Sequence, residues 1–185
     1  MLARSSTAGL FAVALLALPA DHAAPSYTLE STGALAVSSS GPEASFGRVP
    51  ESPQGRPAIS ITLGAPTGQA VLALYTYADI PLTPGRYPVA MELPDDPATP
   101  LRFHPCFIVG TPEHPRGFFH GETGWVTVTD VGPRWIAGQF EIEAQGFLAE
   151  NDRDESRRVT IRGRFGAKGD STVALVAMSA DSTRS

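Results

Sequence analysis

Apolar and polar residues alternate with a period of two in short runs along this chain, which is the pattern of β-strands with one buried face. The two clearest runs cover residues 138–143 and 159–165. Folding the chain about the polar stretch between them pairs each phenylalanine with a strand glycine whose gap its ring can cover. The pairs are Gly163 with Phe140 and Gly138 with Phe165, and Glu141 falls opposite Arg162 on the other face. The runs therefore predict one antiparallel β-hairpin.

Similar runs recur along the rest of the chain, whereas no long segment carries an apolar stripe at helical spacing that is free of glycine and proline. We predict strands at residues 27–37, 58–64, 70–77, 86–91, 101–109, 125–130, 135–145, 157–167 and 172–178, and a further pairing segment at residues 44–48. Loops are expected at residues 38–42, 50–57, 81–85, 94–100 and 111–117. The pattern favours an all-β fold, either an antiparallel β-sandwich or a flattened, lipocalin-like barrel of about nine strands.

A second hairpin is expected just before the first, with one strand in common. The strand at residues 125–130 turns at residues 130–133 into the strand at residues 135–145. This hairpin brings Val128 near Ile136 and Val126 near Gly138. By alternation, Trp125 and Trp135 lie on the opposite side of the sheet. They form either a binding surface or the cover over a second packed layer, and packing is the preferred interpretation.

The first 24 residues have the three parts of a secretory signal peptide. A basic start at Arg4 precedes an apolar run at residues 8–18, and small residues follow at a cleavage site after Ala20, Ala23 or Ala24. The run is too short to span a bilayer, and no later apolar segment is long enough for a membrane helix. We expect a signal peptide at residues 1–24, a single all-β domain at residues 25–185, and a secreted or periplasmic protein of bacterial origin.

Charge argues against a nucleic-acid partner, and the cysteine content excludes stabilisation by an internal disulfide. The formal net charge is -5, and the basic residues form no stripe, which argues against a nucleic-acid partner. Cys106 is the only cysteine, so the chain cannot form an internal disulfide. Its apolar neighbours indicate a buried thiol that packs as a small hydrophobic side chain.

Residues 104–122 hold a cluster of side chains of the types that bind metals. They are His104, Cys106, Glu113, His114, His120 and Glu122. Their spacing is irregular and matches neither C-x-x-C nor H-E-x-x-H. The preferred interpretation is therefore ordinary strand and loop histidines beside a buried thiol, with no cofactor. A metal site formed by His104, Cys106, His114 and His120 is the alternative.

Three segments in the last third of the domain carry a resemblance. They are G-W-V-T-V-T at residues 124–129, I-A-G-Q-F-E-I-E-A at residues 136–144 and V-T-I-R-G-R-F at residues 159–165, with L-T-P-G-R-Y-P at residues 82–88 upstream. This series resembles a pattern in uncharacterised secreted or envelope proteins of bacteria, over roughly residues 58–167. The resemblance implies a compact β-sandwich or barrel-like fold and no catalytic residue. Many of those proteins carry a lipid-bearing cysteine, which is absent here and whose absence favours soluble release.

The chain shows no signature of catalysis. It lacks a G-x-S-x-G serine motif and a glycine-rich nucleotide loop. We therefore predict a noncatalytic binding or structural module of the bacterial envelope or exterior, whose partner is an envelope component, a carbohydrate, a protein or a small apolar ligand. A lipocalin-like carrier of a small apolar ligand is one alternative. A metal-dependent enzyme that uses residues 104–122 is another.

Overall fold

The computed structural model describes residues 24–49, 56–65, 67–93, 96, 99–111, 114–149 and 157–169. The strands are β1 (Ser26–Gly33), β2 (Val37–Gly41), β3 (Ala44–Val49), β4 (Ala58–Leu63), β5 (Ala70–Tyr77), β6 (Gly85–Pro88), β7 (His104–Gly110), β8 (Pro115–Gly132), β9 (Trp135–Leu148) and β10 (Arg157–Gly169). The predicted all-β fold is confirmed. Within the described residues there is no helix long and apolar enough to cross a membrane.

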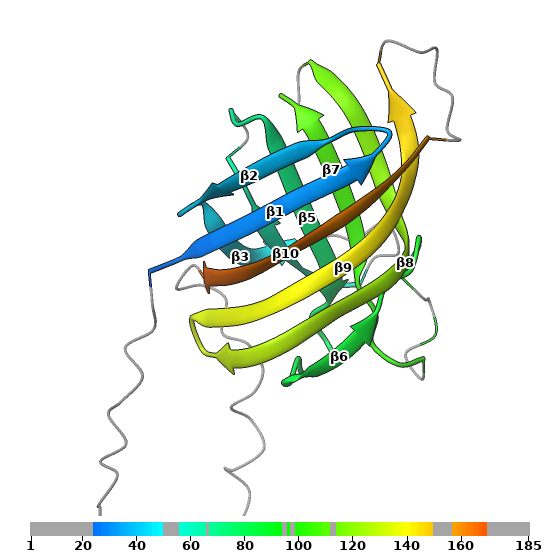
Figure 1. Cartoon of the computed structure of the whole chain (residues 1–185). Coiled ribbons are helices and arrows are strands. Elements are labelled where there is room, and N and C mark those ends of the chain that lie inside the picture. Colours follow the sequence, from blue (N-terminus) through cyan, green and yellow to red (C-terminus); the bar gives the residue numbers. More distant parts are fainter. Residues whose placement is uncertain are drawn as a thin grey trace, which may run out of the picture.

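The ten strands form one sheet that curls round and partly closes on itself. Neighbouring strands follow the order β2-β1-β10-β3-β4-β5-β7-β8-β6, and β9 lies between β10 and β8. All named pairs are antiparallel except β10 with β3, which meet in parallel over two residue pairs. In Figure 1, β1, β2, β9 and β10 lie in front, and β5 and β7 cross behind them. The architecture is thus closer to a flattened, incompletely closed barrel than to two separate sheets.

Inward-facing side chains from both sides of this sheet form one core. The burial pattern alternates strictly along β7 and along most of β9, as expected for strands with one face inside and one outside. Phe140, Ile142, Ile161 and Phe165 are all at most 4% exposed and occupy the interior. These four side chains take up interior space that an enclosed small apolar ligand would need, which disfavours a carrier that would hold its ligand among them.

The hairpin of β9 and β10 has the predicted register. Gly163 lies opposite Phe140, Phe165 opposite Gly138, and Arg162 opposite Glu141. A Cβ atom placed on Gly163 would lie 2.6 Å from the Phe140 ring, and one on Gly138 would lie 2.9 Å from the Phe165 ring. The two rings stack with their centroids 6.4 Å apart. Each ring therefore occupies the space that a glycine leaves free.

The predicted register of β8 with β9 is wrong by two residues. Val128 lies opposite Gly138 and Val126 opposite Phe140. The prediction placed the turn too early, because β8 continues to Gly132 and contains an irregularity between Val128 and Asp130. A shift of two residues keeps every side chain on its predicted face, so Val126 and Val128 are still buried.

Three other predictions needed correction, and two lie wholly or almost wholly outside the described residues. The predicted strand at residues 27–37 is interrupted after Gly33, whose φ is 102°, and the serines assigned to a loop at residues 38–42 belong to β2. The predicted loop at residues 111–117 contains the start of β8 at Pro115. The predicted strand at residues 172–178 is outside the described part of the chain, as is nearly all of the predicted signal peptide.

Candidate functional site

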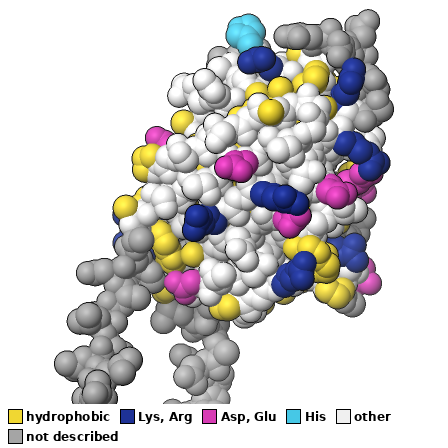
Figure 2. Space-filling model, viewed as in Figure 1, with side chains coloured by type: hydrophobic (Ala, Val, Ile, Leu, Met, Phe, Trp, Pro, Cys, Tyr) yellow, Lys and Arg dark blue, Asp and Glu magenta, His cyan; other side chains and the backbone are white. Residues whose placement is uncertain are grey.

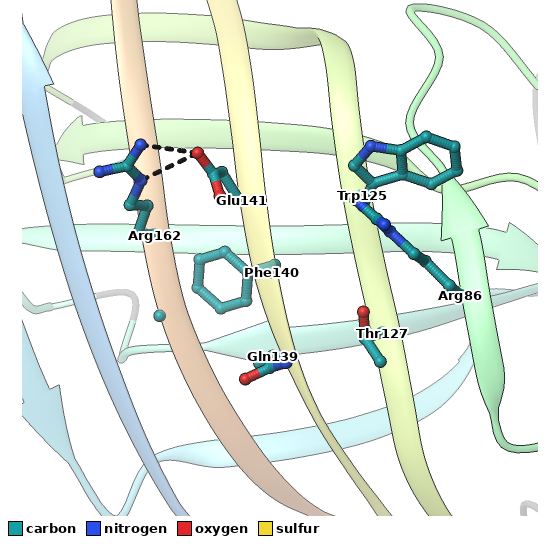
Figure 3. Close-up of a pocket in the computed structure, with 8 residues that line it drawn as sticks. Arg86, Trp125, Thr127, Gln139, Phe140, Glu141 and Arg162 are labelled. Atoms are coloured by element: carbon teal, nitrogen blue, oxygen red, sulfur yellow. Dashed lines mark hydrogen bonds and ion pairs between the residues drawn. The ribbon is translucent and has the colours of Figure 1, made fainter.

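Trp125 is an exposed aromatic residue on the outer face of the sheet. Its side chain projects from β8 and is 42% exposed, and among the described residues only Met91 is another large hydrophobic side chain exposed to this degree. Thr127, two residues further along β8, lies opposite Arg86 of the edge strand β6. The Arg86 guanidinium lies 4.2 Å from the centre of the indole, in a cation–π contact that favours one orientation of the ring (Figure 3).

Shallow hollows adjoin Trp125 in both directions along β8. Toward Thr127, a hollow of about 410 Å³ is lined by Arg86, Trp125, Thr127, Gln139, Phe140, Glu141, Arg162 and Gly163. Toward Thr123, a hollow of about 550 Å³ is lined by Arg86, Pro88, Val89, Thr123, Gly124, Trp125, Glu141 and Glu143. Both are open to solvent along the seam between β8 and β9.

The floor of the first hollow carries an ordered pair of charged side chains. Arg162 donates hydrogen bonds from Nη2 and Nε to Oε1 of Glu141, at 2.6 and 3.1 Å, as Figure 3 shows. Both side chains are at least 60% exposed, so the pair adds little to stability. Its geometry instead presents fixed polar atoms beside the indole. This confirms the predicted cross-strand pair.

Trp135 was predicted to face outward with Trp125, but only Trp125 is exposed. Trp135 is 8% exposed, because its ring lies against Gly166 of β10. A Cβ atom on Gly166 would approach that ring to 2.6 Å. Of the two interpretations proposed for these tryptophans, packing therefore describes Trp135, and Trp125 retains a surface suited to binding.

A third hollow extends the exposed surface from Trp125 toward Trp135. Its volume is about 560 Å³, and it is lined by Ser26, Tyr27, Thr28, Thr129, Trp135, Ala137, Gly138, Gln139, Arg164, Phe165 and Gly166. Gln139 lines this hollow and the first one. The three hollows thus follow residues 123–129 of β8 in order, over about 20 Å of strand. We call this surface the Trp125 track.

Part of the predicted metal cluster comes together elsewhere on the outer face. His104 and Cys106 occupy alternate positions of β7, and β8 places His120 opposite Cys106. Cys106 Sγ lies 3.3 Å from His104 Nε2 and 3.7 Å from His120 Nδ1. All three side chains are half-buried, and their donor atoms lie within 4.8 Å of one another. We call these three residues the His–Cys–His cluster.

The other predicted ligands do not join the cluster. His114 is exposed just before β8, six residues from His120, which corresponds to about 20 Å of extended chain. Glu122 forms an ion pair with Arg158, at 3.3 Å between Oε2 and Nη2. Glu113 is outside the described residues. Of the four residues in the alternative ligand set, the structure brings His104, Cys106 and His120 together and leaves His114 outside the group.

Burial favours the neutral form of the thiol in the cluster. It raises the pKa of the Cys106 thiol to about 11. Burial is also the main cause of a raised pKa at Tyr75, to which the nearby Cys106 adds. Both groups are therefore neutral at pH 7. Cys106 is a half-buried thiol in contact with two imidazoles, whereas the sequence had indicated a fully buried one.

Arg86, Thr127 and Gln139 were not predicted as site residues, although a signal for two of them was present. Strand alternation places Thr127 and Gln139 on the same face as Trp125. No protein-family model, curated protein or solved structure matches this chain.

Proposed function

We propose that this protein is an exported, noncatalytic domain that binds a polysaccharide chain along the Trp125 track. The observation that carries the proposal is the exposed indole of Trp125, fixed by Arg86 and followed along the strand by hollows with polar walls. The signal-like residues 1–24 support export. Export places the domain where cell-surface polysaccharides occur.

The chemistry of the track matches the chemistry of a sugar chain. A sugar ring has an apolar face of C–H groups and a rim of hydroxyl groups. The indole of Trp125 offers a flat apolar surface, and the side chains of Gln139 and Glu141 offer acceptors and donors for hydroxyl groups within hydrogen-bonding reach of a ligand there. Hollows in a row suit an extended polymer better than a single small molecule.

The charges of this face favour a neutral sugar chain over a polyanion. Three basic side chains line the track, Arg86, Arg162 and Arg164, against two acidic ones, Glu141 and Glu143, so the basic excess is a single charge. Figure 2 shows acidic and basic side chains interspersed over the visible face, with small separate hydrophobic patches. A polyanion would require a larger excess of basic side chains. A large apolar partner would require a broader hydrophobic surface.

The test is binding of the protein to a panel of soluble neutral oligosaccharides and insoluble polysaccharides. We expect Trp125→Ala to lower the affinity for the recognised sugar at least tenfold, because the stacking surface is removed. Met91→Ala is the matched control, since Met91 is 45% exposed and does not line the track. The proposal fails if no polysaccharide retains the protein, or if Trp125→Ala binds as tightly as the unaltered chain.

A further inference from the structure

We propose that His104, Cys106 and His120 form a binding site for one Zn²⁺ ion on the outer face of β7 and β8. This site is separate from the Trp125 track. Its three side chains come from two hydrogen-bonded strands, so the backbone ladder already holds their Cα atoms in place. The core-facing residues of β7 between and after them, Pro105 and Phe107, are buried and fix the side from which His104 and Cys106 project.

The distances in the His–Cys–His cluster fit a tetrahedral ion. Zinc bonds of about 2.3 Å to sulfur and about 2.0 Å to nitrogen, at a tetrahedral angle, separate the two ligand atoms by about 3.5 Å. The Sγ atom of Cys106 lies 3.3 Å from Nε2 of His104 and 3.7 Å from Nδ1 of His120. Both ligand pairs therefore match without movement of the strands. Two nitrogen ligands of one tetrahedral zinc ion lie about 3.3 Å apart. All ligand atoms of the cluster lie within 4.8 Å of one another, so the two imidazole nitrogens have to approach each other by at most about 1.5 Å.

A second observation, independent of these distances, orients one of the ligands. His104 Nδ1 lies 3.3 Å from the carbonyl oxygen of Ala90. Because a carbonyl only accepts, this contact places the ring proton on Nδ1 and leaves the lone pair of Nε2 directed at Cys106. A histidine that ligates a metal usually donates its other ring N–H to a carbonyl or carboxylate in this way. The cluster thus contains an oriented ligand.

Each histidine of the cluster contacts an aromatic ring that restricts its motion. The Phe118 ring meets the His120 ring edge to face, with centroids 4.6 Å apart. The Tyr75 ring lies 6.3 Å from that of His104. With these rings beside them, the three ligands are half-buried. An ion can therefore enter from solvent but would bind in a site that is partly screened from water.

The ligand types favour zinc over harder ions. One thiolate and two imidazoles suit Zn²⁺, whereas Mg²⁺ and Ca²⁺ require oxygen ligands. Binding converts the thiol of Cys106 into a thiolate and releases one proton to solvent, while each imidazole contributes a lone pair and stays neutral. Three protein ligands leave a fourth coordination position for water or an exogenous donor.

The experiment is a titration of the metal-free full chain with Zn²⁺, and in parallel with Co²⁺ as a spectroscopic probe. We expect one ion per chain, a thiolate-to-cobalt charge-transfer band, and a rise in Tm on addition of Zn²⁺. Cys106→Ser should abolish the band. His104→Gln and His120→Gln should each weaken Zn²⁺ binding at least tenfold.

His114→Gln is the matched control, because it removes a histidine from the same region that lies outside the cluster. It should bind Zn²⁺ as the unaltered chain does, and Trp125→Ala should do so as well. Thermal unfolding of each metal-free variant shows whether it is folded. The proposal is overturned if the folded chain takes up no stoichiometric ion, if Cys106→Ser leaves the cobalt band intact, or if His114→Gln weakens binding as much as His120→Gln.

Discussion

Single glycines decide where aromatic rings pack in this protein. Gly163 and Gly138 each lie under a phenylalanine of the neighbouring strand, and Gly166 lies under Trp135. An aromatic ring that covers a strand glycine buries a large apolar area without any gap in the layer. The two phenylalanine pairs were predictable from strand pairing, because each pair lies directly across the hairpin. The Trp135 contact was not, since Trp135 and Gly166 are diagonal neighbours.

We expect Gly163→Ala to lower the free energy of unfolding by about 1–3 kcal/mol, because the added methyl group has no space. It would lie 2.6 Å from the Phe140 ring and would also meet the backbone carbonyl of Thr28. Gly47→Ala in β3 is the matched control: apart from the two chain neighbours of Gly47, no atom of the described residues lies within 4 Å of the added Cβ, so a change under about 0.5 kcal/mol is expected. Urea unfolding measures both, and equal losses in the two variants would contradict the pairing.

The raised pKa of Cys106 predicts an unusual pH profile for a half-buried thiol. Because the thiolate is the nucleophile, the rate of alkylation in the metal-free chain should rise about tenfold per pH unit from pH 8 and level off only near the pKa of about 11. A plateau near pH 9 would show an unperturbed thiol.

The raised pKa of Cys106 also makes the free energy of unfolding fall as the pH rises. The thiol ionises at about pH 8.5 in the unfolded chain but near 11 in the folded one, so its contribution is fully present below pH 8.5 and is lost as the pH rises through 11. The difference in unfolding free energy between the unaltered chain and Cys106→Ala should therefore change in that range and be constant below it.

At the scale of the element, β8 explains both the success and the failure of the sequence prediction. Its second half alternates in polarity and was predicted, whereas residues 115–117 were assigned to a loop and residues 118–124 to no element. There the inward positions include Gly117 and Gly121, whose missing side chains make room for Phe119 and Pro105, while Phe118 and His120 face outward. Apolar and polar residues therefore do not alternate in this segment as they do in a typical strand, and its glycine content suggests a loop.

This misassigned half of β8 also hid the His–Cys–His cluster. The residue types at His104, Cys106 and His120 were noted from the sequence, but their convergence depends on the register of β7 with β8. Cys106 and His120 meet only because β8 begins at Pro115 and pairs with β7 from there. The sequence prediction placed no strand directly after the loop that ends at residue 117, so the pairing of β7 with the first half of β8 could not be derived.

For the molecule as a whole, the sequence predicted the fold class but could not choose between sandwich and barrel. Closure depends on a parallel contact of two residue pairs, Lys168 with Ser45 and Gly169 with Phe46. So short a contact leaves no periodic pattern in the sequence. Gly169 lies under the Phe46 ring, where an added Cβ atom would be 2.7 Å from Cε2, which repeats at the seam the glycine–aromatic pairing of the hairpin.

Partial closure makes a prediction about cooperativity. If the seam between β10 and β3 joins the two ends of the ring, amides in β4 and β10 should exchange with deuterium at the same free energy, equal to that of global unfolding. The outer edge strands β2 and β6 should exchange faster, because each has a neighbour on one side only.

Phe46→Ala removes a ring that is 2% exposed and should cost about 3–5 kcal/mol. In that variant we expect β4 to exchange at a lower free energy than β10, because the loss falls on the seam and the strands beside it. Uniform exchange of β4 and β10 in the variant would show that the remaining strand pairs alone couple them, and unequal exchange in the unaltered chain would show that the seam couples nothing.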